Sequence, residues 1–115
     1  MTPEKLPLSS VAFVEEIKIK GYLLNLSHAQ GKSKAKFFLN RGFTIDKWQD
    51  IEISLRAQGQ NNHVTKTVAT AYGDRYTVDC NCPTPDGSNP CIRTVWEIRN
   101  SDSSPRLITA HPLNR

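Results

Sequence analysis

Histidine, lysine and arginine side chains are the groups in this sequence best suited to acid–base and phosphate chemistry. Cleavage of RNA by its own 2′-hydroxyl needs a base for that hydroxyl, an acid for the leaving oxygen and cations beside the phosphorane. Histidine exchanges protons near neutral pH, so His28 and His111 are the candidates for such roles, and His28 is the stronger one. The basic residues of matching type are Lys32 or Lys34 and Arg93 or Arg106.

The positive charge is concentrated in one stretch without acidic residues. Between Glu16 and Asp46 the net charge is +6, whereas the rest of the chain carries −2. A concentrated basic segment indicates a polyanionic partner, either nucleic acid or an acidic protein surface, and a solvated lysine-rich face is the alternative. The basic residues of this stretch are Lys18, Lys20, Lys32, Lys34, Lys36 and Arg41.

Metal and cofactor motifs are not evident in the sequence. Cys80, Cys82 and Cys91 lack the paired C-x₂-C spacing that is typical of zinc sites, which favours structural or incidental cysteines over a zinc site. We find no nucleophile elbow, no glycine-rich phosphate loop and no clustered carboxylates. We therefore expect no metal and no cofactor, and any activity to use histidine, basic and hydroxyl groups.

Length and composition favour a single domain, residues 1–115. The 115 residues with 37% apolar content suit one modest hydrophobic core in a soluble protein. The longest apolar run, Val11 to Val14, is far shorter than the roughly 20 residues of a membrane span. An odd number of cysteines is typical of a reducing compartment, so we predict a cytoplasmic location and no membrane partner.

These candidate residues are carried by a helical part and a sheet part. We expect two to three helices within about residues 14–60, the second beginning near the N-cap Ser33. The third is expected to run from the cap Thr44 to Gly59.

The sheet part covers about residues 63–112. Its short polar connections predict an antiparallel β-meander, so the whole is an α+β fold with helices packed on one face. The expected strands are Val64–Tyr72, Arg75–Cys80, Ile92–Arg99 and Arg106–His111.

Strand alternation places the candidate hydroxyl groups. A period of two puts Leu107, Thr109 and His111 on one face of the last strand and Thr94 on one face of the strand before it. A Thr94–Thr109 pair beside a histidine would bind phosphate oxygens, and ordinary strand threonines are the alternative.

Several motifs together resemble a known group of proteins. The motifs are "GYLLN", the "H" and "GKSKAKFF" that follow, "RGF", "TPDG", "RTVWEI" and "PRLITAHP". They cover about residues 15–113 and are similar to a family of uncharacterised bacterial domains. That family resembles the superfamily of barnase, EndoU, colicin and RelE-type ribonucleases, the BECR fold, in which helices precede a four-stranded antiparallel sheet.

The resemblance implies a toxin-like, metal-independent endoribonuclease, paired with an acidic antitoxin or immunity protein. Its implied catalytic residues are His28, Lys32, Thr94 and Thr109. The resemblance also implies roles for Lys34, Arg93 and Arg106, which we expect to bind substrate. Lys36 and Arg41 of the basic stretch are expected to bind substrate with them, as is His111, which departs from the family pattern because an aromatic residue is expected there. The alternative is a non-catalytic interaction domain whose basic face binds an acidic protein.

Overall fold

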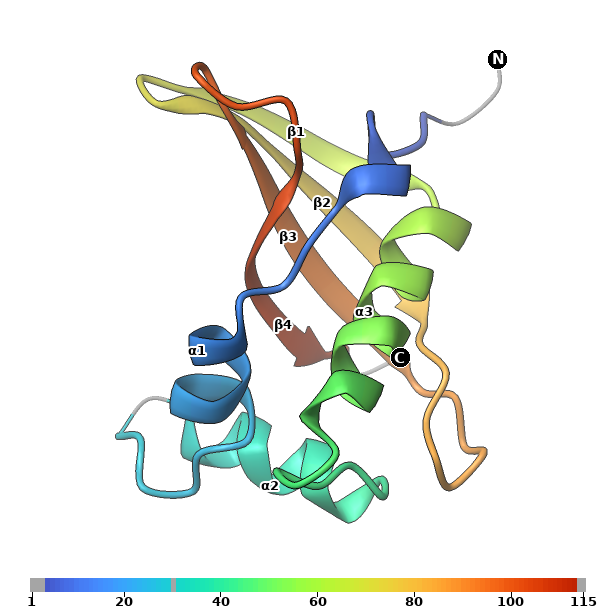
Figure 1. Ribbon diagram of the computed structural model, residues 1–115. Helices are drawn as coiled ribbons and strands as arrows, with labels where there is room; N and C mark the ends of the chain where they lie inside the picture. Colours follow the sequence, from blue (N-terminus) through green and yellow to red (C-terminus); the bar gives the residue numbers. More distant parts are fainter. Residues whose placement is uncertain (1–3, 30, 114–115) are drawn as a thin grey trace.

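The computed structural model describes residues 4–29 and 31–113 of the chain, with helices first and a sheet after them (Figure 1). The helical elements are η1 Ser9–Val11, α1 Glu16–Lys18, the π-helical turn η2 Ile19–Leu23, α2 Lys32–Asn40 and α3 Trp48–Asn61. The strands are β1 Val64–Thr70, β2 Gly73–Asn81, β3 Cys91–Arg99 and β4 Arg106–Pro112. The predicted α+β class, with helices before a four-stranded antiparallel sheet, is confirmed.

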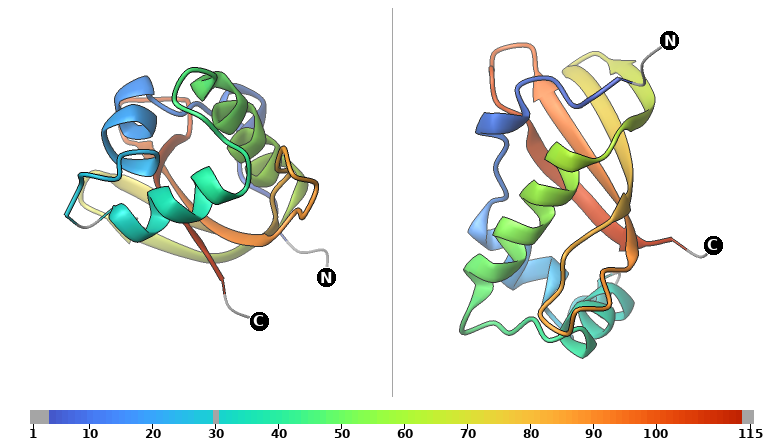
Figure 2. Two further views of the ribbon diagram at one scale, coloured as in Figure 1. Left: turned by 90° about the horizontal axis from the view of Figure 1, so that it is seen from below. Right: turned by 90° about the vertical axis from the view of Figure 1, so that its right-hand side faces the viewer.

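Only one face of the sheet is covered. The strands follow the order β1-β2-β3-β4, and α3 packs against β2 and β3 on the face that we call the inner face (Figure 2). The short helix α2 lies across one end of the sheet, near β4 (Figure 1). No helix among the described residues packs on the opposite, outer face, so polar side chains of the strands are accessible there. No helix within the described ranges has the length and apolar character that crossing a bilayer requires.

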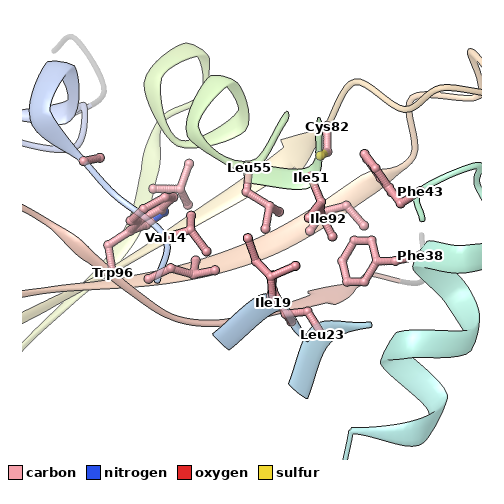
Figure 3. Packing of buried hydrophobic residues seen from close by; sticks show 14 of the residues in the cluster. Val14, Ile19, Leu23, Phe38, Phe43, Ile51, Leu55, Cys82, Ile92 and Trp96 are labelled. Atoms are coloured by element: carbon pink, nitrogen blue, oxygen red, sulfur yellow. The ribbon is translucent and has the colours of Figure 1, made fainter. Parts of the chain in front are cut away.

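Apolar side chains of the inner face form the core. Alternate residues of the strands point inward, and the fully buried ring of Trp96 lies at one end of the cluster (Figure 3), against Gly59 of α3. Phe38 of α2 and Ile19 of η2 close the other end of the same cluster. Each such side chain contributes about 1.5–3 kcal/mol when it is fully buried, so this core fixes the helices relative to the sheet.

A buried polar network fastens α3 to the sheet. The Gln58 side chain donates hydrogen bonds to the carbonyl oxygens of Val78 (2.9 Å) and Ile92 (2.8 Å). Its carbonyl oxygen accepts a bond from the Thr94 hydroxyl at 2.6 Å, and Trp96 Nε1 donates to that hydroxyl at 2.7 Å. Thr94 is completely buried, so its hydroxyl serves the core and is not available to a substrate.

The bounds of α3 differ from the prediction at both ends. The Thr44 hydroxyl accepts a hydrogen bond from the Lys47 N–H (3.2 Å), but this bond closes a separate turn. The helix itself begins at Trp48, four residues after the predicted cap. Gly59 lies inside α3, where a Cβ would come within 2.9 Å of the Trp96 ring. The prediction that the helix ends at Gly59 is therefore wrong. A glycine is needed here inside the helix because the Trp96 ring packs directly against its backbone.

An irregularity in β4 changes which side chains face outward. Val95 of β3 pairs with Thr109, but the next residue, Trp96, pairs with Leu107. Ile108 is therefore an extra residue of β4, a β-bulge. The prediction that Leu107 shares a face with Thr109 and His111 is therefore wrong. Leu107 and Ala110 are buried in the core, whereas Thr109 pairs with an outward residue of β3.

Candidate functional site

Lys34 joins three elements that are distant in the sequence. Helix α2 begins at Lys32 with Gly31, not Ser33, as its N-cap, and it brings Lys34 beside β4. The Lys34 ammonium donates hydrogen bonds to the Tyr22 hydroxyl and to Thr109 Oγ1, the latter at 3.1 Å. The two hydroxyl oxygens lie 3.5 Å apart. A lysine and two hydroxyl groups therefore meet where η2, α2 and β4 come together.

These groups line an open pocket, which we call the Lys34 pocket. Its volume is about 520 Å³, within the range of small-molecule sites. The side chains that line it are Lys18, Tyr22, His28, Lys34, Ile108 and Thr109. Three predicted site residues, His28, Lys34 and Thr109, are thus brought together.

The residues of this cluster change the pKa of Tyr22. Burial on its own would raise the pKa of Tyr22, but the hydrogen bonds with Lys34 and Thr109 oppose it. The charges of Lys34 and Lys18 act in the same direction, and the net effect is a pKa below the ordinary value of a tyrosine. The phenolate of Tyr22 is therefore easier to form here than in water.

His28 is held by its backbone surroundings and by Tyr22. Its Nδ1 accepts a hydrogen bond from the Gly31 N–H at 2.9 Å, which assigns the proton of the neutral imidazole to Nε2. The His28 and Tyr22 rings meet edge to face, with centroids 4.9 Å apart. The proton of neutral His28 is therefore on Nε2, and the ring contact holds the Tyr22 ring in position.

Gly31 allows this close arrangement. A Cβ at this position would lie 2.8 Å from Cδ1 of the Tyr22 ring and 3.0 Å from the Tyr22 carbonyl oxygen. Gly31 also supplies the N–H that binds His28. The absence of a side chain here thus permits both the helix start and the packing of the pocket wall.

The lysines around the pocket are not neutralised within the described part of the chain. No ion pair between described residues includes Lys18, Lys32, Lys34 or Lys36, whereas Lys20 pairs with Glu16 at 2.8 Å. Lys32 and Lys36 are exposed on α2. The pocket and its surroundings therefore keep a positive potential that favours an anionic ligand.

A polar row on the outer face leads to the pocket. The Arg93 guanidinium binds both carboxylate oxygens of Asp79, each at 2.9 Å, and Thr65 donates to the same carboxylate at 3.2 Å. His111 stands opposite Arg93 in the next strand. Burial and then the charges of Lys34 and Arg93 lower the pKa of His111, while Asp79 acts in the opposite direction.

The remaining predicted cations lie elsewhere. Arg41 follows the C-terminal end of α2 and stacks over Phe37, with 4.8 Å between the guanidinium and the ring centroid. Arg106 stands at the start of β4, 3.7 Å from a carboxylate oxygen of Glu15. Neither lines the Lys34 pocket. Thr94 faces the core from the inner face of the sheet, so it is not part of this pocket either.

The cysteines take no part in the pocket. Cys82 is buried, and burial raises the pKa of its thiol to about 12, so the reactive thiolate is strongly disfavoured. Over residues 4–29 and 31–113, no group of three or more His, Cys, Asp or Glu residues is placed to hold a metal ion.

Tyr22 is the residue of the pocket that sequence reasoning missed. It lies within "GYLLN", a motif of the family resemblance in which no residue is predicted to have a role in the site. Its partner Thr109 is 87 residues away, so the contact cannot be predicted from the spacing of neighbouring residues. The one usable signal is a tyrosine shortly before His28 in a stretch without acidic residues.

Comparisons with known proteins give a family and a fold. A family model described as "Domain of unknown function (DUF6883)" matches residues 5–114. A solved structure titled "Contact-dependent growth inhibition toxin - immunity protein complex from Klebsiella pneumoniae 342" contains a similar chain, with 18% sequence identity and a TM-score of 0.71. The match covers 94% of this chain and 98% of that one, and at this identity it shows a shared fold. No curated protein matches the chain.

Proposed function

This chain belongs to the family described as a domain of unknown function (DUF6883), and we propose that it is a toxin-like, metal-independent endoribonuclease acting in the cytoplasm of a target cell. The observation that carries the proposal is the double hydrogen bond from Lys34 to Tyr22 and Thr109 beside His28. It brings a cation, a tyrosine of lowered pKa and two further polar groups to one anion-attracting pocket.

The chemistry follows from these groups. The Tyr22 phenolate accepts the proton of the RNA 2′-hydroxyl, and the 2′-oxygen attacks the neighbouring phosphorus. Lys34 stabilises the negative charge of the phosphorane and gives a proton to the leaving 5′-oxygen as the phosphorus–oxygen bond breaks. The products are a 2′,3′-cyclic phosphate and a 5′-hydroxyl. The hydrogen bond between Tyr22 and Lys34 then returns the proton to Lys34.

The other pocket groups bind and orient the phosphate. Thr109 holds Lys34 in place, and His28 orients the Tyr22 ring rather than serving as the base, because the Gly31 N–H occupies its Nδ1 lone pair. Lys18, which lines the pocket, adds positive charge there, and Lys32 is exposed on the helix that carries Lys34. His111 follows Thr109 by two residues on β4 and pairs with Arg93 of β3, and both are assigned to substrate binding.

We also propose that a protein partner binds this chain and neutralises its activity. The similar chain comes from a structure titled as a toxin–immunity protein complex. The uncompensated lysines around the Lys34 pocket favour an acidic partner that covers the pocket and competes with RNA.

Induced expression in a bacterium tests the proposal. We expect the unmodified chain to arrest growth and fragment cellular RNA. Lys34→Met removes the cation that touches both hydroxyls and is expected to lower cleavage by about 10²–10³-fold, as loss of one charge-stabilising donor does in other enzymes.

Lys36→Met is the matched control, since Lys36 is an exposed lysine on the same helix and outside the pocket. It is expected to behave like the unmodified chain. Growth arrest with intact RNA, or equal toxicity of Lys34→Met and the unmodified chain with both proteins present at equal levels, contradicts the ribonuclease assignment. The first result would favour an interaction domain that acts on an acidic protein.

A further inference from the structure

A second cationic cluster lies on the outer face, at the end of β3 away from the Lys34 pocket. Glu97 is only 4% exposed and accepts hydrogen bonds from Nε of Arg75 (2.9 Å) and Nε of Arg99 (3.1 Å). The bond from Arg75, against the effect of burial, and then that from Arg99 lower the pKa of Glu97, so the carboxylate is ionised at neutral pH. One buried negative charge thus holds two arginines apart in fixed positions.

The arginines keep binding capacity after this pairing. A guanidinium has five N–H groups, and each of these ion pairs engages Nε alone. The terminal nitrogens of Arg75 and Arg99 therefore remain outside the contact with Glu97, on side chains that are 46% and 44% exposed. The cluster carries one net positive charge and two forks of the shape that binds phosphate oxygens in pairs.

An aromatic side chain stands beside these forks. Tyr72 is 75% exposed at the β1–β2 turn and lines a pocket of about 460 Å³ with Arg75, Arg99 and Asn100. The turn is held by the Asn100 N–H, which donates to the Tyr72 carbonyl at 2.9 Å, and by the Asn100 side chain, which donates to Ala71 at 3.1 Å. We call this site the Arg75–Arg99 pocket.

The two pockets share the outer face. Thr109 of the Lys34 pocket pairs with Val95 of β3, and Arg99 follows four residues later on the same strand. At about 3.3 Å per residue, the two positions are about 13 Å apart along the strand. Within residues 4–29 and 31–113, no helix lies over the outer face of the strands between these positions (Figure 2). A flexible, linear anion can therefore occupy both pockets at once.

We propose that the Arg75–Arg99 pocket is a second subsite for single-stranded RNA, where Arg75 and Arg99 bind a phosphate and Tyr72 stacks on a base. The inference rests on the proposed function in that the same strand enters the Lys34 pocket for cleavage. Stacking on an exposed aromatic ring combined with backbone phosphate contacts is a general mode of single-strand binding. An acidic protein surface would use the arginines but gives no reason for a single strand to require Tyr72.

Binding of a single-stranded RNA that cannot be cleaved tests this subsite. A fully 2′-O-methylated, fluorescently labelled strand lacks the attacking hydroxyl, so its affinity reports binding alone. We expect Tyr72→Ala to weaken binding by about tenfold through lost stacking, and Tyr72→Phe to bind like the unmodified chain. Arg99→Gln is expected to reduce the slope of log affinity against log salt by about 0.7, the value for one phosphate contact on a single strand.

Lys47→Gln is the matched control, because it removes one positive charge from an exposed residue ahead of α3, away from the outer face. It should leave the salt slope unchanged. Unaltered binding by Tyr72→Ala and Arg99→Gln overturns the subsite, as does an equal loss of slope in Arg99→Gln and Lys47→Gln. A failure of the unmodified chain to bind the strand at low salt also overturns it.

The outcome also separates this inference from the proposed function. If the chain binds RNA with the expected losses but cleaves no RNA, the subsite stands and the ribonuclease assignment fails. If cleavage occurs, Tyr72→Ala should slow cleavage of long strands and leave a dinucleotide unaffected, since a dinucleotide fills only the Lys34 pocket. An equal effect of Tyr72→Ala on both substrates contradicts the subsite.

Discussion

Tyr22 gains its chemical character from residues that surround it in the fold. The same side-chain type behaves in the opposite way at Tyr76, where burial, followed by the charges of Asp74 and Glu4, raises the pKa. At Tyr22 burial also raises the pKa, but the hydrogen bonds with Lys34 and Thr109 and the charges of Lys34 and Lys18 together outweigh it, so the pKa is lowered. The contrast gives Tyr22 a physical reason to accept a proton that residue type alone does not provide.

Titration of the tyrosines tests this difference. We expect Tyr22 to ionise at lower pH than Tyr76 when each is followed by NMR. Lys34→Met removes a hydrogen bond and a positive charge from the phenolate, so the pKa of Tyr22 should rise. Because the ionised form is the base, cleavage should increase with pH through the Tyr22 pKa, and Lys34→Met should move that rise to higher pH. A Tyr22 titration that is unchanged in Lys34→Met contradicts the assigned role of Lys34.

The sequence predicted several residues of the site correctly, but it did not predict which residues they contact. His28, Lys34 and Thr109 were among the predicted residues and line one pocket. Thr94 was grouped with Thr109 because both are strand threonines, yet Thr94 is bonded to Gln58 in the core. Alternation predicts a face of a strand, but which face a helix will cover depends on packing across the whole chain.

At the scale of elements, the turn around Gly31 controls the shape of the site. The segment from η2 to α2 must bring Tyr22 and Lys34 together, and Gly31 lies in contact with the Tyr22 ring. A side chain here would displace that ring, or the start of α2, by several tenths of an ångström or more. The pocket therefore depends on a residue that has no chemical group of its own.

Gly31→Ala tests this dependence. The added Cβ should push the Tyr22 ring away, raise the Tyr22 pKa, and destabilise the fold by about 1–3 kcal/mol as overpacking does. Gly21→Ala is the control, because a Cβ there meets Ile17 at 3.6 Å, an ordinary contact distance. Thermal unfolding gives the stability, and NMR gives the Tyr22 titration. An unchanged Tyr22 pKa in Gly31→Ala contradicts the account of this turn.

The strands were predicted more accurately than the helices. All four strands were predicted to within a few residues, because alternating residues and polar turns leave few registers that bury one face. The bulge at Ile108 could not be predicted, since nothing in the local sequence distinguishes it from a regular strand residue. Helix α3 was displaced because Thr44 and Gly59 carry signals of helix ends that the fold uses for a turn and for packing.

At the scale of the whole molecule, the residues that stabilise the fold are separate from the residues that we assign to binding. Buried residues of the helices and the inner face form one core, whereas Thr109 of the Lys34 pocket and the Arg75 and Glu97 pair of the Arg75–Arg99 pocket occupy outward-facing positions of the strands. Binding groups mounted on a packed sheet keep their spacing, which favours a substrate that must meet both pockets in register. The acid-free stretch contributes its charge at one end of this surface.

The products of RNA treated with the purified chain test the central claim most directly. In the presence of a chelator, we predict single-strand fragments that end in a 2′,3′-cyclic phosphate and begin with a 5′-hydroxyl, detected by mass spectrometry. Tyr22→Phe should abolish these fragments and Lys34→Met should reduce them by about 10²–10³-fold, whereas Lys36→Met should leave them unchanged. Fragments with 5′-phosphate ends, cleavage that stops when divalent metal is removed, or intact RNA at every concentration of the chain would contradict the account.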